Sequence, residues 1–157
     1  MALIETIYRY RTLLGKCELG VGLGLDEAED VMAIEAAFRA TADELRARGR
    51  TFRREAVRVG GLLRGDRIHD RVGVSEIGLG GFIVRKAPFI AKGELVELEI
   101  EIGDLALRFC ARGVWLKEDG DDYRVGLAMV GMPVCLHRVV VSTHHADVID
   151  EISAVAA

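Results

Sequence analysis

Two short stretches of the chain carry side chains that could bind an anionic ligand. The first is a cluster of three arginines within six residues: Arg53, Arg54 and Arg58. The second is a turn with a carboxylate at its entrance and glycines after it: Glu76, Gly78, Gly80 and Gly81. Guanidinium groups hold phosphate oxygens with paired hydrogen bonds and stack on purines, while glycines let a backbone approach a ligand closely. A carboxylate can accept hydrogen bonds from a guanine edge. The combination predicts a pocket for an anionic ligand that contains a purine.

The order and spacing of these residues resemble the PilZ domain family. The family pattern is Arg-x-x-x-Arg before a strand, followed further along by Asp or Asn in Asp/Asn-x-Ser-x-x-Gly. The corresponding residues here are Arg54-x-x-x-Arg58 and Glu76-Ile-Gly78-Leu-Gly80-Gly81. The resemblance covers roughly residues 52–130. It implies a small β-barrel that binds the bacterial second messenger cyclic di-GMP.

The resemblance also implies a role for each residue of the motif. Arg54 and Arg58 would hold the phosphates and stack on guanine, with Arg53 in support. Glu76 would face a guanine edge, and the three glycines would let the turn close on the ligand. Without the family pattern, the same arginines could equally form a solvated linker and the glycine turn an ordinary hairpin.

Two positions depart from the family pattern. Glu76 stands where the family has Asp or Asn, so its carboxylate is displaced by about one bond length, roughly 1.5 Å. Gly78 stands where the family has Ser, which removes one neutral hydrogen bond worth about 0.5–1.5 kcal/mol, or a factor of about 2 to 13 in affinity. These losses predict weakened rather than abolished binding. The alternative is a degenerate PilZ-like domain that binds no nucleotide and acts as a protein adaptor.

Composition limits the remaining possibilities. The chain has 157 residues, half of them apolar, and a formal net charge of −4. These values predict one domain with a real core, and the acidic balance argues against binding of nucleic-acid polymers. The chain has three widely spaced cysteines, Cys17, Cys110 and Cys135. Their number and spacing favour a reducing cytoplasm over a disulfide framework. We expect no membrane span or signal peptide.

The first fifty residues predict a helical hairpin. Apolar residues at helical spacing indicate a helix over 3–14 that stops near Gly15. A second helix is predicted over 26–48, with Asp26 as its cap and Glu29 completing a capping box. Its apolar residues are spaced nearly as heptads. This face could pack on the first helix or the barrel, or it could mediate homo-oligomerisation.

From residue 56 onward the apolar pattern becomes that of strands. Six strands are predicted, at 56–65, 70–76, 81–87, 93–103, 105–117 and 123–130. Short turns between them predict a six-stranded antiparallel barrel, with Trp115 in its core or at its rim. A helix at 145–155 would follow. The predicted organisation is a helical extension, a barrel and a C-terminal helical segment, at 1–50, 51–133 and 134–157.

No catalytic or metal-binding pattern is visible in the sequence. Ser75 lacks the second glycine of a Gly-x-Ser-x-Gly elbow, and no P-loop is present. Cys135, His137, His144 and His145 match none of the usual zinc spacings. We therefore expect a non-enzymatic cytoplasmic receptor without cofactor or metal. Ligand binding would reorder residues 49–58 and change the surface offered to an unknown protein partner.

Overall fold

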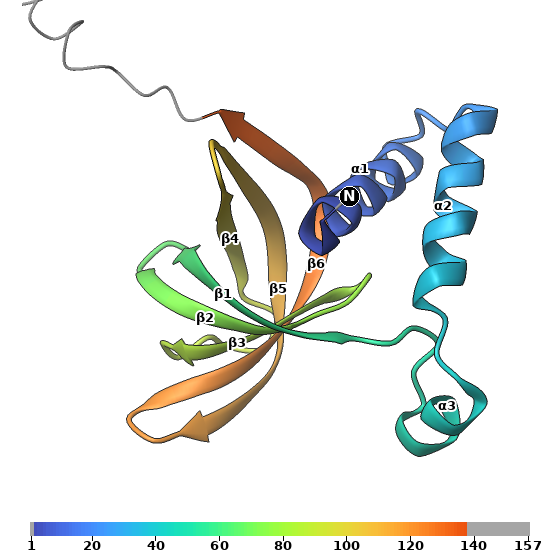
Figure 1. The fold of residues 1–157 in the computed structure, drawn as a ribbon. Coiled ribbons are helices and arrows are strands. Elements are labelled where there is room, and N and C mark those ends of the chain that lie inside the picture. Colours follow the sequence, from blue (N-terminus) through green and yellow to red (C-terminus); the bar gives the residue numbers. More distant parts are fainter. Residues whose placement is uncertain (1, 138–157) are drawn as a thin grey trace, which may run out of the picture.

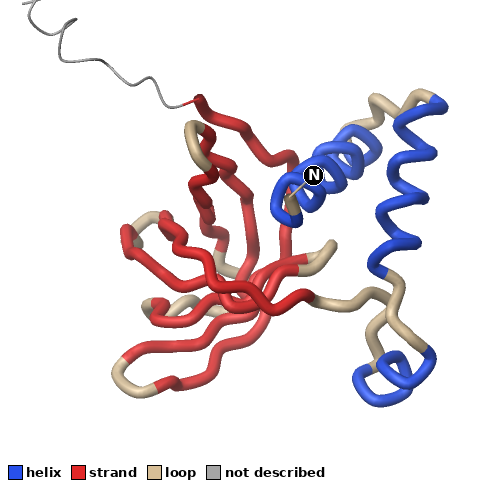
Figure 2. The backbone as a smooth tube through the Cα atoms, viewed as in Figure 1, coloured by secondary structure: helices blue, strands red, loops and turns tan. Residues whose placement is uncertain are grey.

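The computed structural model describes residues 2–137 and contains a β-barrel with helices on one side (Figures 1 and 2). The helices are α1 (Leu3–Glu18), α2 (Leu25–Phe38) and α3 (Ala42–Arg48). The strands are β1 (Glu55–Arg64), β2 (His69–Ile77), β3 (Gly81–Ala87), β4 (Leu95–Ile102), β5 (Leu105–Asp119) and β6 (Asp122–His137).

The six strands close into one antiparallel barrel in the order β1-β2-β3-β6-β5-β4. Alternating apolar residues point inward, as along β4, where Val96, Leu98 and Ile100 are buried. The barrel closes over a short ladder in which Leu62–Arg64 pairs with Glu97–Glu99. The predicted six-stranded antiparallel barrel is confirmed.

Helix α1 packs against β6 and joins the barrel core. Ile7 is fully buried, and the Tyr8 ring lies 6.2 Å from that of Phe109. The predicted helix end at Gly15 is wrong, because the helix continues through it to Glu18. A Cβ at Gly15 would stand 3.1 Å from Met132 Cε, so the glycine lets β6 approach the helix closely.

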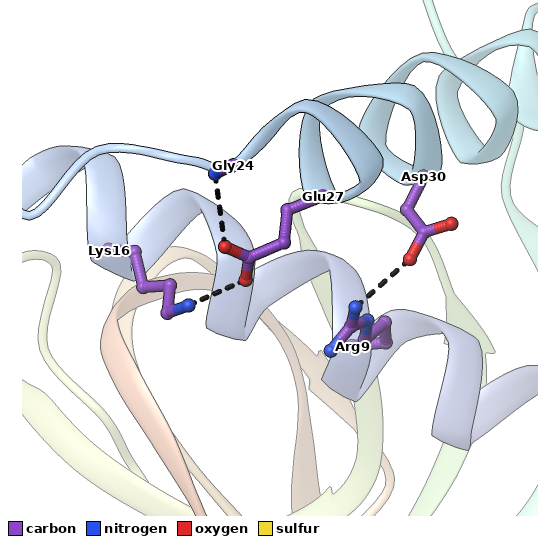
Figure 3. Close-up of polar contacts among 5 residues, drawn as sticks. All are labelled: Arg9, Lys16, Gly24, Glu27 and Asp30. Atoms are coloured by element: carbon purple, nitrogen blue, oxygen red, sulfur yellow. Dashed lines mark hydrogen bonds and ion pairs between the residues drawn. The ribbon is translucent and has the colours of Figure 1, made fainter.

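Polar side chains join α1 to α2 (Figure 3). Arg9 Nη2 lies 3.0 Å from Asp30 Oδ2, and Lys16 Nζ lies 2.5 Å from Glu27 Oε2. Glu27 also accepts a hydrogen bond of 3.2 Å from the Gly24 N–H. The hydrogen bond from the Lys16 ammonium is the largest cause that holds the pKa of Glu27 below its usual value. The hydrogen bond between the N-cap residue Gly24 and Glu27 caps the N-terminus of α2.

The sequence-based helix over 26–48 is wrong in its extent. The predicted cap at Asp26 lies inside α2, whose N-cap is Gly24. The helix breaks at Arg39, which takes an extended conformation (φ −60°, ψ 127°) and pairs with Phe52. A new helix, α3, begins after Thr41, whose hydroxyl caps it.

The last strand runs further than its sequence suggests. β6 continues to His137, past the predicted end at 130 and past the expected boundary of the barrel at 133. It does so by pairing with β5 across a bulge between Arg108 and Cys110. The predicted helix at 145–155 lies outside the described residues. Within 2–137, no helix has the length and apolar character to cross a membrane, and no cluster of side chains could hold a metal ion.

Candidate ligand-binding cavity

The arginine-bearing loop before β1 is fixed to the end of α2 by backbone pairing. The Ala40 N–H donates to the Thr51 carbonyl at 3.0 Å, and the Arg53 N–H donates to the Phe38 carbonyl at 2.8 Å. The Arg53 guanidinium lies 5.9 Å from the centre of the Phe38 ring and forms an ion pair of 2.9 Å with Glu55. Movement of this loop is therefore coupled directly to α2.

The glycine turn lies beside that loop, and its three glycines differ in how much space a side chain would have. The Gly78 N–H donates to the Gly81 carbonyl at 2.9 Å, which closes the turn. A Cβ at Gly78 would stand 3.0 Å from Arg54 Cγ, so the missing side chain gives room to the arginine stem. A Cβ at Gly81 would stand 2.0 Å from the Leu127 carbonyl oxygen, whereas Gly80 has open space.

Arg54 is the most unusual charged residue of the site. Its Nη1 atom is buried and has no hydrogen-bond partner within residues 2–137. Burial lowers the pKa of the guanidinium and repulsion from Arg50 lowers it further, while Glu76 acts in the opposite direction. Arg54 is half-buried rather than fully buried, so only its Nη1 atom lacks a partner while the rest of the side chain keeps contact with solvent.

A cavity of about 520 Å³ lies between the loop and the turn. Its volume is within the range typical of small-molecule sites. Five of the seven predicted site residues line it: Arg53, Arg54, Gly78, Gly80 and Gly81. Arg50 and Trp115 line it as well. The cavity thus combines three arginines, a glycine backbone and two aromatic residues, Phe52 and Trp115.

Trp115 is the functional candidate that sequence reasoning missed, since it was assigned only to the core or rim of the barrel. A register shift between Gly113 and Trp115 changes the pairing of β5 with β6 at this point. The indole lies against the backbone of β6 at Gly126, where a Cβ would stand 2.2 Å from Trp115 Nε1. The signal in the sequence that could have found Trp115 is Gly126. This glycine lies on the predicted strand 123–130, which follows the strand that carries the tryptophan and was expected to pair with it.

The remaining two predicted residues do not line this cavity. Arg58 lies on β1 and lines a separate groove of about 850 Å³, together with Arg71 and Lys86. Glu76 is half-buried and forms an ion pair of 3.5 Å with Arg124.

Arg124 connects Glu76 to the edge of the cavity. Its guanidinium lies 5.9 Å from the centre of the Trp115 ring, so one arginine contacts both the carboxylate and the aromatic group. Nε of Arg124 is buried and has no hydrogen-bond partner among the described residues. The carboxylate that the motif places near the ligand is therefore already engaged by a cation.

Comparison with known proteins finds similarity to solved structures but no match among sequences. No protein-family model matches the sequence, and no curated protein matches it. Among solved structures, the Bacillus subtilis inhibitor of motility (MotI/DgrA) is similar to this chain, with a TM-score of 0.45 and 16% sequence identity. The similarity covers 53% of this chain and 43% of that chain, so this chain spans less than half of its length. The barrel assignment rests on the strand order and pairing of the chain itself.

Proposed function

We propose that the chain is a PilZ-type receptor that binds cyclic di-GMP in the cavity beside Arg54. The observation that carries the proposal is the buried Arg54 Nη1 atom, which has no partner in the described part of the chain and lies beside the turn that carries Gly81, the glycine of the family pattern. A phosphate oxygen would supply the missing acceptor with a charge-assisted hydrogen bond. The protein would act as a non-enzymatic receptor.

The lining of the cavity suits both parts of a cyclic dinucleotide. Arg53 and Arg54 would hold phosphate oxygens, with Arg50 adding positive charge at the entrance. A guanine base would stack on Trp115, since base–aromatic stacking is worth about 1–3 kcal/mol for each base. Gly80, which has open space where a Cβ would lie, would let the ligand approach the turn without meeting a side chain.

Glu76 and Arg58 do not line the cavity, so we propose other roles for them. Glu76 would reach a guanine edge while remaining close to Arg124, whose charge compensates the carboxylate. Arg58 would contact the ligand only where the ligand extends from the cavity toward the groove on β1. The affinities of Arg54 and Arg58 variants for the ligand therefore show whether it stays in the cavity or extends into the groove.

Ligand binding would be transmitted through α2. The loop that carries Arg53 pairs with Phe38 and Ala40 at the end of this helix. Any reordering of the loop by phosphate changes the same hydrogen bonds, so the two conformational equilibria are linked. We propose that α2 and α3 are the elements that report the bound state to a protein partner.

A second candidate function is a protein adaptor that binds no nucleotide. The observation that favours it is the engagement of Glu76 by Arg124, together with the position of Arg58 outside the cavity. In this case Arg54 would serve only the packing of the loop on Gly78.

Isothermal titration calorimetry with cyclic di-GMP separates the two functions. Removing a charge-assisted hydrogen bond costs about 1.5–3 kcal/mol, so Arg54→Ala should weaken binding by a factor of about 13 to 160. The matched control is Arg67→Ala, which removes an exposed arginine from the turn between β1 and β2 and should leave affinity unchanged. GTP serves as the nucleotide control.

The outcome for Arg58→Ala shows how far the ligand extends. A loss comparable to that of Arg54→Ala places the ligand across the cavity and the groove, whereas a change below about threefold confines it to the cavity. Absence of heat with the unmodified protein at ligand concentrations on the order of 1 mM would contradict the receptor function. Amide exchange over residues 49–58 tests the switch, because an unchanged exchange pattern with saturating ligand rules it out.

A further inference from the structure

Trp115 lies between the cavity and Arg124 on the outer face of the barrel. The residues of β6 that belong to the core here are Val125, Leu127 and Met129. Side chains alternate along a strand, so Arg124, Gly126 and Ala128 share the outer face. Gly126 and Ala128 line the cavity with Trp115, whereas Arg124 is not among its lining residues. Since Trp115 pairs with Gly126, Arg124 lies next to it on the side away from the cavity.

The indole of Trp115 contacts β6 at two successive outer positions. At Gly126 a Cβ would stand 2.2 Å from the indole Nε1, so the missing side chain lets the ring lie against the strand. At Arg124 the guanidinium lies 5.9 Å from the ring centre. The glycine therefore makes room for the ring, and the arginine limits how the ring can turn within that room.

Arg124 is itself anchored from across the neighbouring strand. Its Nη2 atom lies 3.5 Å from Oε1 of Glu76 on β2, and β3 runs between β2 and β6. Ile83 of β3 pairs with Glu76 on one side and with Gly126 on the other. This isoleucine is only 3% exposed, although it lies outside the core cluster to which both of its chain neighbours belong. Side chains on the outer face therefore cover β3 where the ion pair crosses it.

We propose that Arg124 is a positioning residue that fixes the orientation of the Trp115 indole at the edge of the cavity, with Glu76 anchoring the arginine. A tryptophan side chain has several staggered rotamers, and a cation over one ring face favours the rotamer that keeps this contact. A ring that is already oriented loses less conformational freedom when a base stacks on it. The inference deepens the receptor function proposed above and rests on it for the ligand, a guanine base.

Stabilisation of the barrel is the alternative role for Arg124. The side chains of Arg124 and Glu76 are 38% and 30% exposed, and ion pairs with this much contact with solvent contribute little to stability. Arg124→Ala should therefore leave the urea unfolding transition nearly unchanged. A change in the behaviour of Trp115 without a change in unfolding separates positioning from a structural role.

Fluorescence measures the orientation of the indole without any ligand. Trp115 is the single tryptophan of the sequence, so emission, acrylamide quenching and the near-ultraviolet circular dichroism of the indole report on this residue alone. Arg124→Ala should increase quenching and weaken the dichroism band. Glu76→Gln should change both in the same direction, because the arginine loses its anchor. The matched control is Lys117→Ala, which removes an exposed cation that pairs with Arg124 in the ladder and lies over no aromatic ring of residues 2–137.

Calorimetry with cyclic di-GMP tests whether the arginine acts through the ring. Trp115→Ala should weaken binding by about 5- to 150-fold, the range for loss of one stacked base. Arg124→Ala should weaken it by about threefold or more, and Lys117→Ala by less. In the double variant the loss should equal that of Trp115→Ala alone, because without the ring the arginine has nothing to position. Trp115→Phe takes the place of Trp115→Ala if circular dichroism shows that the alanine variant is not folded.

The outcomes distinguish the positioning role from the receptor function. Unchanged quenching in Arg124→Ala, an equal effect of Lys117→Ala, or losses of affinity that add fully in the double variant would each overturn the role of Arg124. Absence of binding by the unmodified protein would contradict the receptor function, and the quenching comparison would then still decide whether Arg124 positions the indole.

Discussion

Replacement of Gly81 by alanine tests whether the last glycine of the motif serves the barrel or the ligand. Gly81 begins β3 and pairs with Ala128 of β6. A Cβ at this position would stand 2.0 Å from the Leu127 carbonyl oxygen, and real Cβ atoms essentially never approach closer than 3.0 Å. The two strands must therefore separate locally by about 1 Å.

The size of the effect follows from that displacement. Overpacking of this kind costs about 1–3 kcal/mol, and each hydrogen bond lost between the strands costs about 0.5–1.5 kcal/mol more. We expect Gly81→Ala to lower the free energy of unfolding by about 2–4 kcal/mol. For a chain of this length, the melting temperature should fall by roughly 5–15 °C.

Gly80→Ala is the matched control at the adjacent position. Gly80 is exposed, has open space where its Cβ would lie and does not have a positive φ. Its replacement should change the free energy of unfolding by no more than about 0.5 kcal/mol. Urea unfolding followed by circular dichroism measures both variants. Equal stabilities for the two variants would refute the reasoning, because the expected difference rests on the contacts of a Gly81 Cβ with Leu127 and Ala128.

This comparison also affects how the motif is interpreted. If Gly81→Ala is destabilised as expected, closure of β3 on β6 accounts for the glycine without any ligand. The match at Gly81 then supports the barrel, while Arg54 and Trp115 carry the argument for binding. Ligand titrations of Gly81 variants would then be informative only with the folded fraction measured in parallel.

Two further predictions concern other parts of the fold. Gly126→Ala should displace the indole of Trp115, since the new Cβ would stand 2.2 Å from Nε1. As Trp115 is the single tryptophan of the sequence, its fluorescence emission should shift to longer wavelength, and an unchanged spectrum would contradict the placement. Burial and the hydrogen bond to Glu35 raise the pKa of the Tyr10 phenol far above its usual value. The raised pKa favours the folded state below the unfolded pKa of about 10, and this contribution is lost as the pH rises above it. Unfolding in urea at about pH 8 and about pH 10.5 should therefore show a smaller loss of stability in Tyr10→Phe than in the unmodified protein, and equal losses would rule out this assignment.

Sequence alone determined the features that depend on local pattern. Alternation of apolar residues predicted each of the six strands, with the third at 81–87 matching β3 fully. Short turns at positions such as Gly103 predicted that neighbours would be antiparallel. The arginine cluster and the glycine turn were predicted from their residue types and from the resemblance to the PilZ pattern, and five of their seven residues lie around one cavity.

Tertiary structure decided the features that depend on contacts between distant residues. The break at Arg39 follows from its pairing with Phe52, and the continuity of α1 through Gly15 follows from the approach of Met132. Trp115 reached the cavity through the register of β5 on β6, which local periodicity does not encode. Arg58 belongs to another groove for a similar reason, since a bulge between Ala56 and Val59 shifts the register of β1. A strand pattern specifies which side chains alternate, but only the closed barrel fixes which of them meet.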